Sequence, residues 1–150
     1  MTRLAKTSIV LFLALFITLF WTTLLINSSF AGESEIASGT WTTKGYAING
    51  GWKIVARDDK KIIIFDEHFK TKKGPDLKVY LSRKSIKDIG GGDVIQSSVK
   101  ISPLNSHKGA QEYEIPNNVN LNDFASLLIH CEAYAHLWGG AALRWNLENN

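Results

Sequence analysis

Short runs of alternating apolar and polar residues, separated by turn-forming residues, fill the chain after residue 38. A period of two places successive side chains on opposite faces, as in a β-strand with one buried face. In the run 77–82, Leu77, Val79 and Leu81 are predicted to point inward, and Tyr80 outward. The runs that fit a strand are 41–48, 52–56, 62–65, 77–82, 94–101, 111–115, 124–134 and 135–143. The pattern predicts an all-β fold, an antiparallel β-sandwich of about eight short strands.

Turn-forming residues fix the predicted order of these strands. Asn49-Gly50-Gly51 lies between two hydrophobic runs and predicts a hairpin, because both residues of such a turn need positive φ. Residues 57–60 predict the next turn, and the polar, glycine-rich residues 83–93 a loop. The continuous apolar run 62–65 predicts a central strand covered on both faces.

The run 124–134 contains the one cysteine of the chain, Cys131. A strand here places Leu127, Ile129 and Cys131 on one face and His130 on the other. The face with Cys131 is the more apolar, so the thiol is predicted to lie in the core. Free cysteine usually packs as a small hydrophobic residue. His130 is expected at the surface.

Metal binding and catalysis are the next hypotheses for Cys131. Thiolate and imidazole suit copper or zinc, but His130 is a strand neighbour of Cys131 and points to the other face. His136 could share a face with His130, yet no further ligands are evident, so we predict no metal site. A Cys–His nucleophile is disfavoured for the same reason. Glu112 and Glu114 fall on one outward face, the pattern of a solvated strand, and no catalytic residue is assigned.

Aromatic residues are numerous for a chain of this size. Aromatic side chains bury much area and commonly build sandwich cores, whereas an exposed aromatic patch would indicate a binding face. For the group as a whole we predict the core role; its members are Trp41, Trp52, Trp138, Trp145, Tyr46, Tyr80, Tyr113 and Tyr134.

The first 31 residues have the pattern of an export segment. Arg3 and Lys6 precede a mostly apolar run at 7–26, and Ser29-Phe30-Ala31 places small residues where a signal peptidase cleaves. The apolar run of about 20 residues is also long enough to span a bilayer. Two interpretations stay open, a cleaved signal peptide and an uncleaved N-terminal membrane anchor.

Both interpretations place the rest of the chain outside the cytoplasm, in the periplasm or the extracellular space, because the basic end stays inside. Residues 32–38 are then predicted to be a linker and residues 39–147 a single domain. Contact with a membrane is expected only through residues 7–26, if they are not removed.

Charge and cysteine content exclude some functions. The chain has 17 Lys and Arg against 14 Asp and Glu; without Arg3 and Lys6 the count is 15 against 14, a net charge of +1. A domain whose positive and negative charges are so nearly equal has no large positive field to attract nucleic acid or an anionic membrane. A single cysteine excludes an internal disulfide.

Three segments carry a family resemblance. They read GPDLKVYLS at 74–82, GAQEYEIP at 109–116, and FASLLIHC at 124–131 followed by WGGAAL at 138–143. In this order and spacing they resemble the DM-thirteen (DM13) domain family, described as an electron-transfer module, over about residues 38–146.

The resemblance implies a β-sandwich-like domain outside the cytoplasm with one characteristic cysteine, which Cys131 matches. In the family this cysteine is proposed to act as a redox thiol or as a ligand to a prosthetic group such as haem. An aromatic residue is common before it, where this chain has His130.

Two hypotheses follow. In the first, the chain is an exported domain that transfers electrons to an envelope partner through Cys131, as a thiol or as a cofactor ligand. In the second, it is a non-catalytic binding or structural module of the cell envelope, and Cys131 is only packed. Since a thiol reacts as the thiolate, the first hypothesis requires that Cys131 be accessible.

Overall fold

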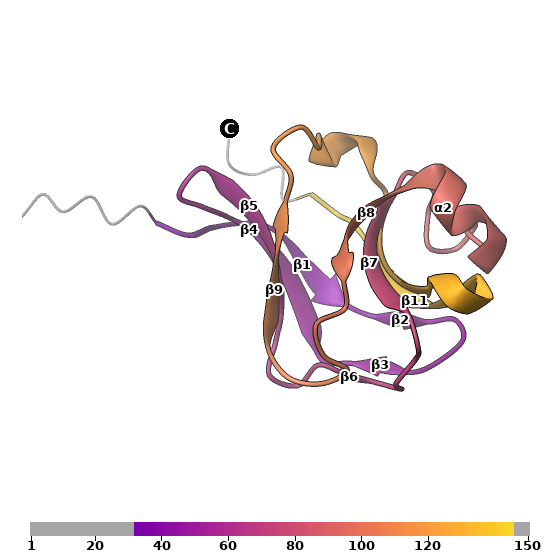
Figure 1. The fold of residues 1–150 in the computed structure, drawn as a ribbon. Coiled ribbons are helices and arrows are strands. Elements are labelled where there is room, and N and C mark those ends of the chain that lie inside the picture. Colours follow the sequence, from indigo (N-terminus) through magenta and orange to yellow (C-terminus); the bar gives the residue numbers. More distant parts are fainter. Residues whose placement is uncertain (1–31, 146–150) are drawn as a thin grey trace, which may run out of the picture. The chain divides into compact units, whose positions relative to one another are not determined.

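The structure is a computed structural model that describes residues 32–145; the predicted export segment 1–31 and residues 146–150 lie outside the described residues. The described part contains eleven strands, eight of which have five residues or more (Figure 1). Every strand pair in it is antiparallel. The prediction of an all-β antiparallel fold is confirmed.

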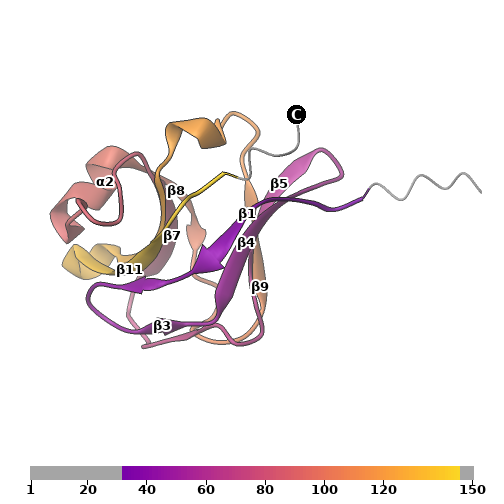
Figure 2. The same ribbon diagram turned by 180° about the vertical axis from the view of Figure 1, so that it is seen from behind.

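Two sheets face each other, with a small third sheet at one end (Figure 2). The first contains, in spatial order, β1 (Ser34–Thr40), β4 (Gly51–Arg57), β5 (Lys60–Phe65) and β9 (Gln111–Ile115). The second contains β2 (Thr42–Thr43), β11 (His136–Ala142), β10 (Ser126–Cys131), β7 (Leu77–Ser82) and β8 (Ser98–Pro103). The third pairs β3 (Ile48–Asn49) with β6 (Lys70–Thr71). The chain crosses between the two large sheets at both edges, from β1 to β2 and from β8 to β9.

The helical elements of the described part are all short. They are the 3₁₀ turns η1 (Gly91–Asp93), η2 (Leu121–Asp123) and η3 (Glu132–Tyr134) and the single α-helical turn α2 (Val94–Ser97). No helix in residues 32–145 is long and apolar enough to cross a membrane.

The main core lies between the two large sheets. Alternate residues of the strands fill it, as the period of two requires: Ile54, Ile63, Phe65, Val79, Leu81, Ile115, Leu127, Ile129 and Cys131 are all completely buried. Burial of each large side chain contributes about 1.5–3 kcal/mol relative to exposure. The inward direction predicted for Leu77, Val79 and Leu81 is confirmed.

A second apolar cluster covers the outer face of β7, β10 and β11. The segment 83–97, with η1 and α2, folds back over this face (Figure 1) and supplies Ile86, Ile89 and Val94 to it. Tyr80 is buried beneath this segment, so the prediction that it points to solvent is wrong. The predicted strand 94–101 is also shorter than expected, because its first residues form α2.

The predicted linker 32–38 is wrong for most of its length, because β1 begins at Ser34 and pairs with β4. The strand predicted at 41–48 is reduced to the two short strands β2 and β3. These strands are stabilised by backbone pairing with segments that are distant in the sequence. The local sequence does not reveal that pairing.

The hairpin predicted at Asn49-Gly50-Gly51 is wrong, because β3 pairs with β6 and β4 pairs with β1 and β5. Gly50 does have positive φ, but it passes close to Phe69 and Asp66, and Asp66 Oδ2 accepts a 2.6 Å hydrogen bond from the Gly51 backbone N–H. The turn predicted at 57–60 is confirmed: Asp58 and Asp59 both have positive φ and join β4 to β5.

The strand predicted at 62–65 lies between β4 and β9, so its central position is confirmed. Its covering on both faces is confirmed only in part, since Ile62 and Ile64 are half-buried. Glu112 and Glu114 lie on the exposed face of β9, as predicted, and pair with basic side chains of the neighbouring hairpin.

Candidate functional site

Cys131 is the last residue of β10 and lies in the middle of three paired strands. Its Cα partners are Leu77 on β7 and His136 on β11. The residue is 0% exposed and belongs to the core between the sheets, as the sequence predicted. The described clefts are lined by other residues, so the thiol contacts neither solvent nor any of these three clefts.

The chain turns sharply directly after Cys131. The strand ends in η3, whose C-terminal neighbour Ala135 has φ of 46°, a left-handed conformation that is uncommon for alanine. The backbone N–H of Glu132 donates a 3.0 Å hydrogen bond to the carbonyl of Asp76 and fastens the turn to the start of β7. Ala133, expected on the strand, is therefore exposed on the 3₁₀ turn.

His130 is completely buried, and the prediction of a surface histidine is wrong. It points into the second apolar cluster, and neither Nδ1 nor Nε2 has a hydrogen-bond partner. The ring meets Tyr80 edge to face, with centroids 5.9 Å apart. Burial lowers the pKa of His130 below its ordinary value, although the nearby Glu132 carboxylate acts in the opposite direction.

Beside His130, the Tyr80 hydroxyl donates a hydrogen bond to the Glu132 carboxylate, which also pairs with Lys100 Nζ at 3.2 Å. Burial and this carboxylate hold the pKa of Tyr80 well above its ordinary value. The Tyr80 hydrogen bond and Lys100 hold the pKa of Glu132 below its usual range. The negative charge of Glu132, at the edge of the cluster, is thus already paired with Tyr80 and Lys100.

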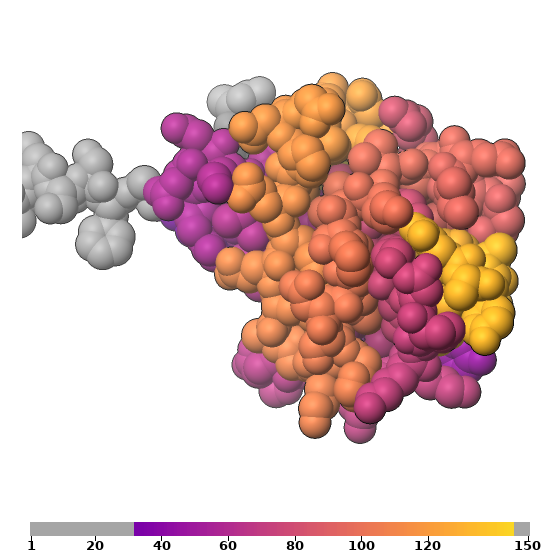
Figure 3. All heavy atoms as spheres, in the orientation of Figure 1, coloured from indigo at the N-terminus to yellow at the C-terminus, as the bar shows by residue number. Residues whose placement is uncertain are grey.

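A cleft of about 330 Å³ lies next to the strand end that carries Cys131. Its lining includes the rings of Tyr46, Tyr134, His136 and Trp138, the two side chains Lys72 and Lys73, and residues 74–75. We call it the aromatic cleft. Figure 3 shows yellow, indigo and magenta atoms, from three distant parts of the sequence, meeting at the lower right of the molecule.

Aromatic contacts and hydrogen bonds hold the rings of Tyr46, His136 and Trp138 in place. The ring centroids of Tyr46 and Trp138 are 4.3 Å apart, and those of His136 and Trp138 5.5 Å. Trp138 Nε1 donates a 3.1 Å hydrogen bond to the Lys72 carbonyl, and Lys72 Nζ lies 4.4 Å from the centroid of Tyr46. His136 packs on Gly45, where an added Cβ would lie 2.1 Å from its Nε2. These rings therefore form one connected group beside Cys131.

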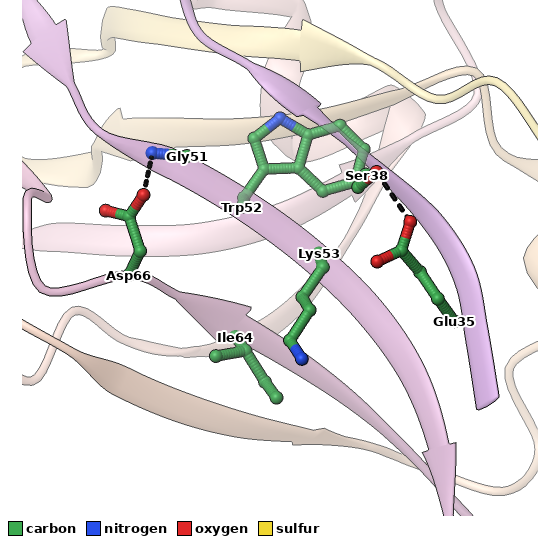
Figure 4. A pocket seen from close by; sticks show the side chains of 7 residues that line it. All are labelled: Glu35, Ser38, Gly51, Trp52, Lys53, Ile64 and Asp66. Atoms are coloured by element: carbon green, nitrogen blue, oxygen red, sulfur yellow. Dashed lines mark hydrogen bonds between the residues drawn. The ribbon is translucent and has the colours of Figure 1, made fainter. Parts of the chain in front are cut away.

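A groove of about 210 Å³ on the first sheet is a weaker candidate for ligand binding (Figure 4). Its polar groups already have partners: Glu35 accepts from Ser38, Lys53 pairs with Glu33, and Asp66 accepts from the backbone of Gly51. A third cleft, of about 280 Å³, continues from the aromatic cleft across residues 73–75 toward the loop at 104–107.

The strand register separates His130 from the other two groups of the metal hypothesis, Cys131 and His136. Because β10 is irregular between Ile129 and His130, His130 is paired with Leu137 and Cys131 with His136. His130 and His136 therefore do not share a face, contrary to the expectation. Among residues 32–145, no three His, Cys, Asp or Glu side chains are arranged to hold a metal ion.

A comparison with protein families decides the relationship of this chain. The family model described as "Electron transfer DM13" matches residues 40–143. The chain belongs to the DM13 family. Searches of curated proteins and of solved structures found no match.

The DM13 segment at 138–143 has a steric reason for its two glycines. A Cβ on Gly139 would lie 2.6 Å from the carbonyl oxygen of Thr42. A Cβ on Gly140 would lie 2.5 Å from the carbonyl oxygen of Leu127. β11 therefore fits between β2 and β10 only with glycine at both positions.

Haem ligation by Cys131, which the DM13 resemblance implied, does not fit this structure. A ligand to haem iron needs an open position beside a cavity large enough for the macrocycle. Cys131 is completely buried between Leu77 and His136 and lines none of the described clefts. We derive no chemistry through haem.

Sequence reasoning found Cys131 but missed the aromatic cleft. Lys72 and Lys73 lie in a connection, and Tyr46 and Tyr134 were assigned to the core; Tyr134 is in fact 71% exposed. A usable signal was present, since two of the three DM13 segments, at 74–75 and at 138, flank the cleft.

Proposed function

We propose that this DM13 domain is exported and transfers electrons in the cell envelope through the thiol of Cys131. The observation that carries the proposal is the DM13 match, which spans residues 40–143 and includes this cysteine. The pattern of residues 1–31 supports export, by cleavage of a signal peptide or by retention as an anchor. The partner is a redox or other protein of the envelope.

The thiol chemistry requires a local opening, because only an accessible thiolate is reactive. In a disulfide formed with a partner's thiol, each sulfur loses one proton and one electron, and an envelope electron acceptor takes up the electrons. The strand end is the place where such an opening costs least. Cys131 is followed directly by a 3₁₀ turn, and its cross-strand neighbour His136 is exposed.

The complete burial of Cys131 favours a second candidate function. In it, the domain is a non-catalytic binding or structural module of the envelope, and the thiol packs as a small apolar group. Cys131→Ala and Cys131→Ser would then cost about 1–3 kcal/mol of stability, through lost packing or a buried hydroxyl, and change no redox property. Chemical denaturation of the two variants measures this cost.

Thiol labelling of the folded protein distinguishes the two functions. If Cys131 is the redox group, a maleimide reagent should label the native protein, and His136→Ala should raise the labelling rate by about tenfold, because it uncovers the strand end. His68→Ala, a change of an exposed histidine that lines none of the described clefts, is the matched control. Labelling that occurs only after denaturation, in the wild type and in His136→Ala alike, would exclude the redox role.

A further inference from the structure

The aromatic cleft exposes two aromatic rings, those of Tyr134 and His136, to solvent. Tyr134 is 71% exposed and projects from η3. In the described part of the chain, Ile95 is the only other large hydrophobic residue that is comparably exposed. His136 is also exposed, so the cleft offers two accessible rings next to the packed pair of Tyr46 and Trp138. Flat ring faces of this kind bind another flat ring by stacking.

The wall behind these rings is rigid. Trp138 is buried to 4% exposure, and its indole is fixed by the hydrogen bond to the Lys72 carbonyl. The backbone N–H groups of Lys44, Gly45 and Tyr46 all donate to the carbonyl of Trp138, at 2.9–3.2 Å. A ligand would therefore meet a surface that is already ordered, which lowers the entropic cost of binding.

The charge of the cleft is positive. Lys72 and Lys73 have no carboxylate within 4 Å among residues 32–145. The two acidic residues near this end are compensated elsewhere, Asp76 by Lys78 and Glu132 by Lys100. The site thus combines ring faces with two uncompensated ammonium groups, which select a negatively charged ligand.

We propose that the aromatic cleft binds a planar aromatic anion, with its ring against Tyr134 and His136 and its negative charge at Lys72 and Lys73. The volume of about 330 Å³ lies at the small end of ligand sites, so the ring system is one of two or three fused rings. No thiol takes part, and the inference does not depend on the proposed role of Cys131.

Flavin mononucleotide and riboflavin test this proposal, because they share one ring system and differ by a phosphate. Each is titrated against the purified full chain in detergent, and the quenching of flavin fluorescence by stacked rings gives the dissociation constant. We expect saturable binding of flavin mononucleotide and binding of riboflavin at least about tenfold weaker.

Four variants locate the site. Replacing both lysines (Lys72→Gln with Lys73→Gln) should weaken flavin mononucleotide about tenfold and leave riboflavin unchanged. Tyr134→Ala should weaken both flavins by a similar factor, because both stack. The matched controls are Lys61→Gln at the far end of β5 and Ile95→Ala on α2, which should bind both flavins as the wild type does.

Three results would overturn the proposal. They are the absence of saturable flavin mononucleotide binding below about 1 mM, equal affinities for the two flavins, and equal losses in the control variants. The Cys131→Ser variant separates this inference from the proposed function. It should bind flavin mononucleotide normally even if thiol labelling excludes the redox role, and a loss of binding there would contradict the placement of the ligand.

Discussion

The variant His130→Leu should be more stable than the wild type by about 1–3 kcal/mol at neutral pH. His130 is completely buried against the apolar cluster of Tyr80, Leu128 and Leu137, and both ring nitrogens lack partners. Such groups lose their hydrogen bonds to water on folding and gain none in return. Leucine fills a similar volume without this loss, and urea denaturation followed by tryptophan fluorescence measures the difference.

The folding stabilities of the wild type and of His130→Leu should also depend differently on pH. The pKa of His130 is lowered in the folded state, so the unfolded chain binds the additional proton, and folding stability rises with pH. The wild type should therefore lose stability as the pH falls below about 6.5, by at most about 1.4 kcal/mol per unit. His130→Leu should lack this loss.

Glu132 and Tyr80, two of the groups around His130, do not account for this pH range. The pKa of Glu132 is lowered and that of Tyr80 is raised, so both titrate outside it. His68→Gln, a change of an exposed histidine, is the control and should keep the wild-type profile. If His130→Leu were less stable than the wild type at both about pH 5 and about pH 7.5, the ring would be making favourable contacts, and the orphaned nitrogens would not be its main energetic feature.

The variant Gly140→Ala should lose about 3 kcal/mol of stability, the upper part of the range for overpacked sites. The new methyl group would lie 2.5 Å from the Leu127 carbonyl oxygen and 2.7 Å from side-chain atoms of Ile86 and Leu128. A side chain can rotate away, but the carbonyl belongs to the strand paired with β11. The pairing of β10 and β11 must therefore shift. This shift would disturb the packing of both the core and the segment 83–97, which lie against these strands.

The matched control is Gly92→Ala, where an added Cβ would have no atom within 4 Å. This variant should change stability by less than about 0.5 kcal/mol. Thermal or urea unfolding of both variants makes the comparison. Equal stabilities of Gly140→Ala and Gly92→Ala would show that β11 has more room than the contact distances indicate.

The burial of Cys131 and of His130 illustrates what could be predicted. The face of Cys131 was correct because a strand repeats every two residues, and its neighbours Leu127 and Ile129 mark that face as apolar. The face of His130 was wrong because its covering comes from Ile86, Ile89 and Val94, in the segment 83–97, which the sequence predicts as a loop and the start of a strand. Alternation reports which face is more apolar and does not report whether the other face is covered.

The aromatic cleft could not be predicted for a related reason. Its residues come from the loop after β2, the connection after β6, and η3 with β11. Each segment is unremarkable by itself, and Lys72 and Lys73 become a charged site only because the acidic residues nearby pair with other lysines. The candidate site thus exists only because the order in which the strands pair brings these three segments together.

The sequence by itself determined the strand class, the positions of most long strands, the inward face of Cys131 and membership of the DM13 family, since these depend on local periodicity and on ordered motifs. Only the tertiary structure decided that β1 replaces a linker, that the segment 83–97 buries His130, and that aromatic rings and lysines meet beside Cys131. Those features arise from contacts between residues far apart in the chain, whose energies no short stretch of sequence contains.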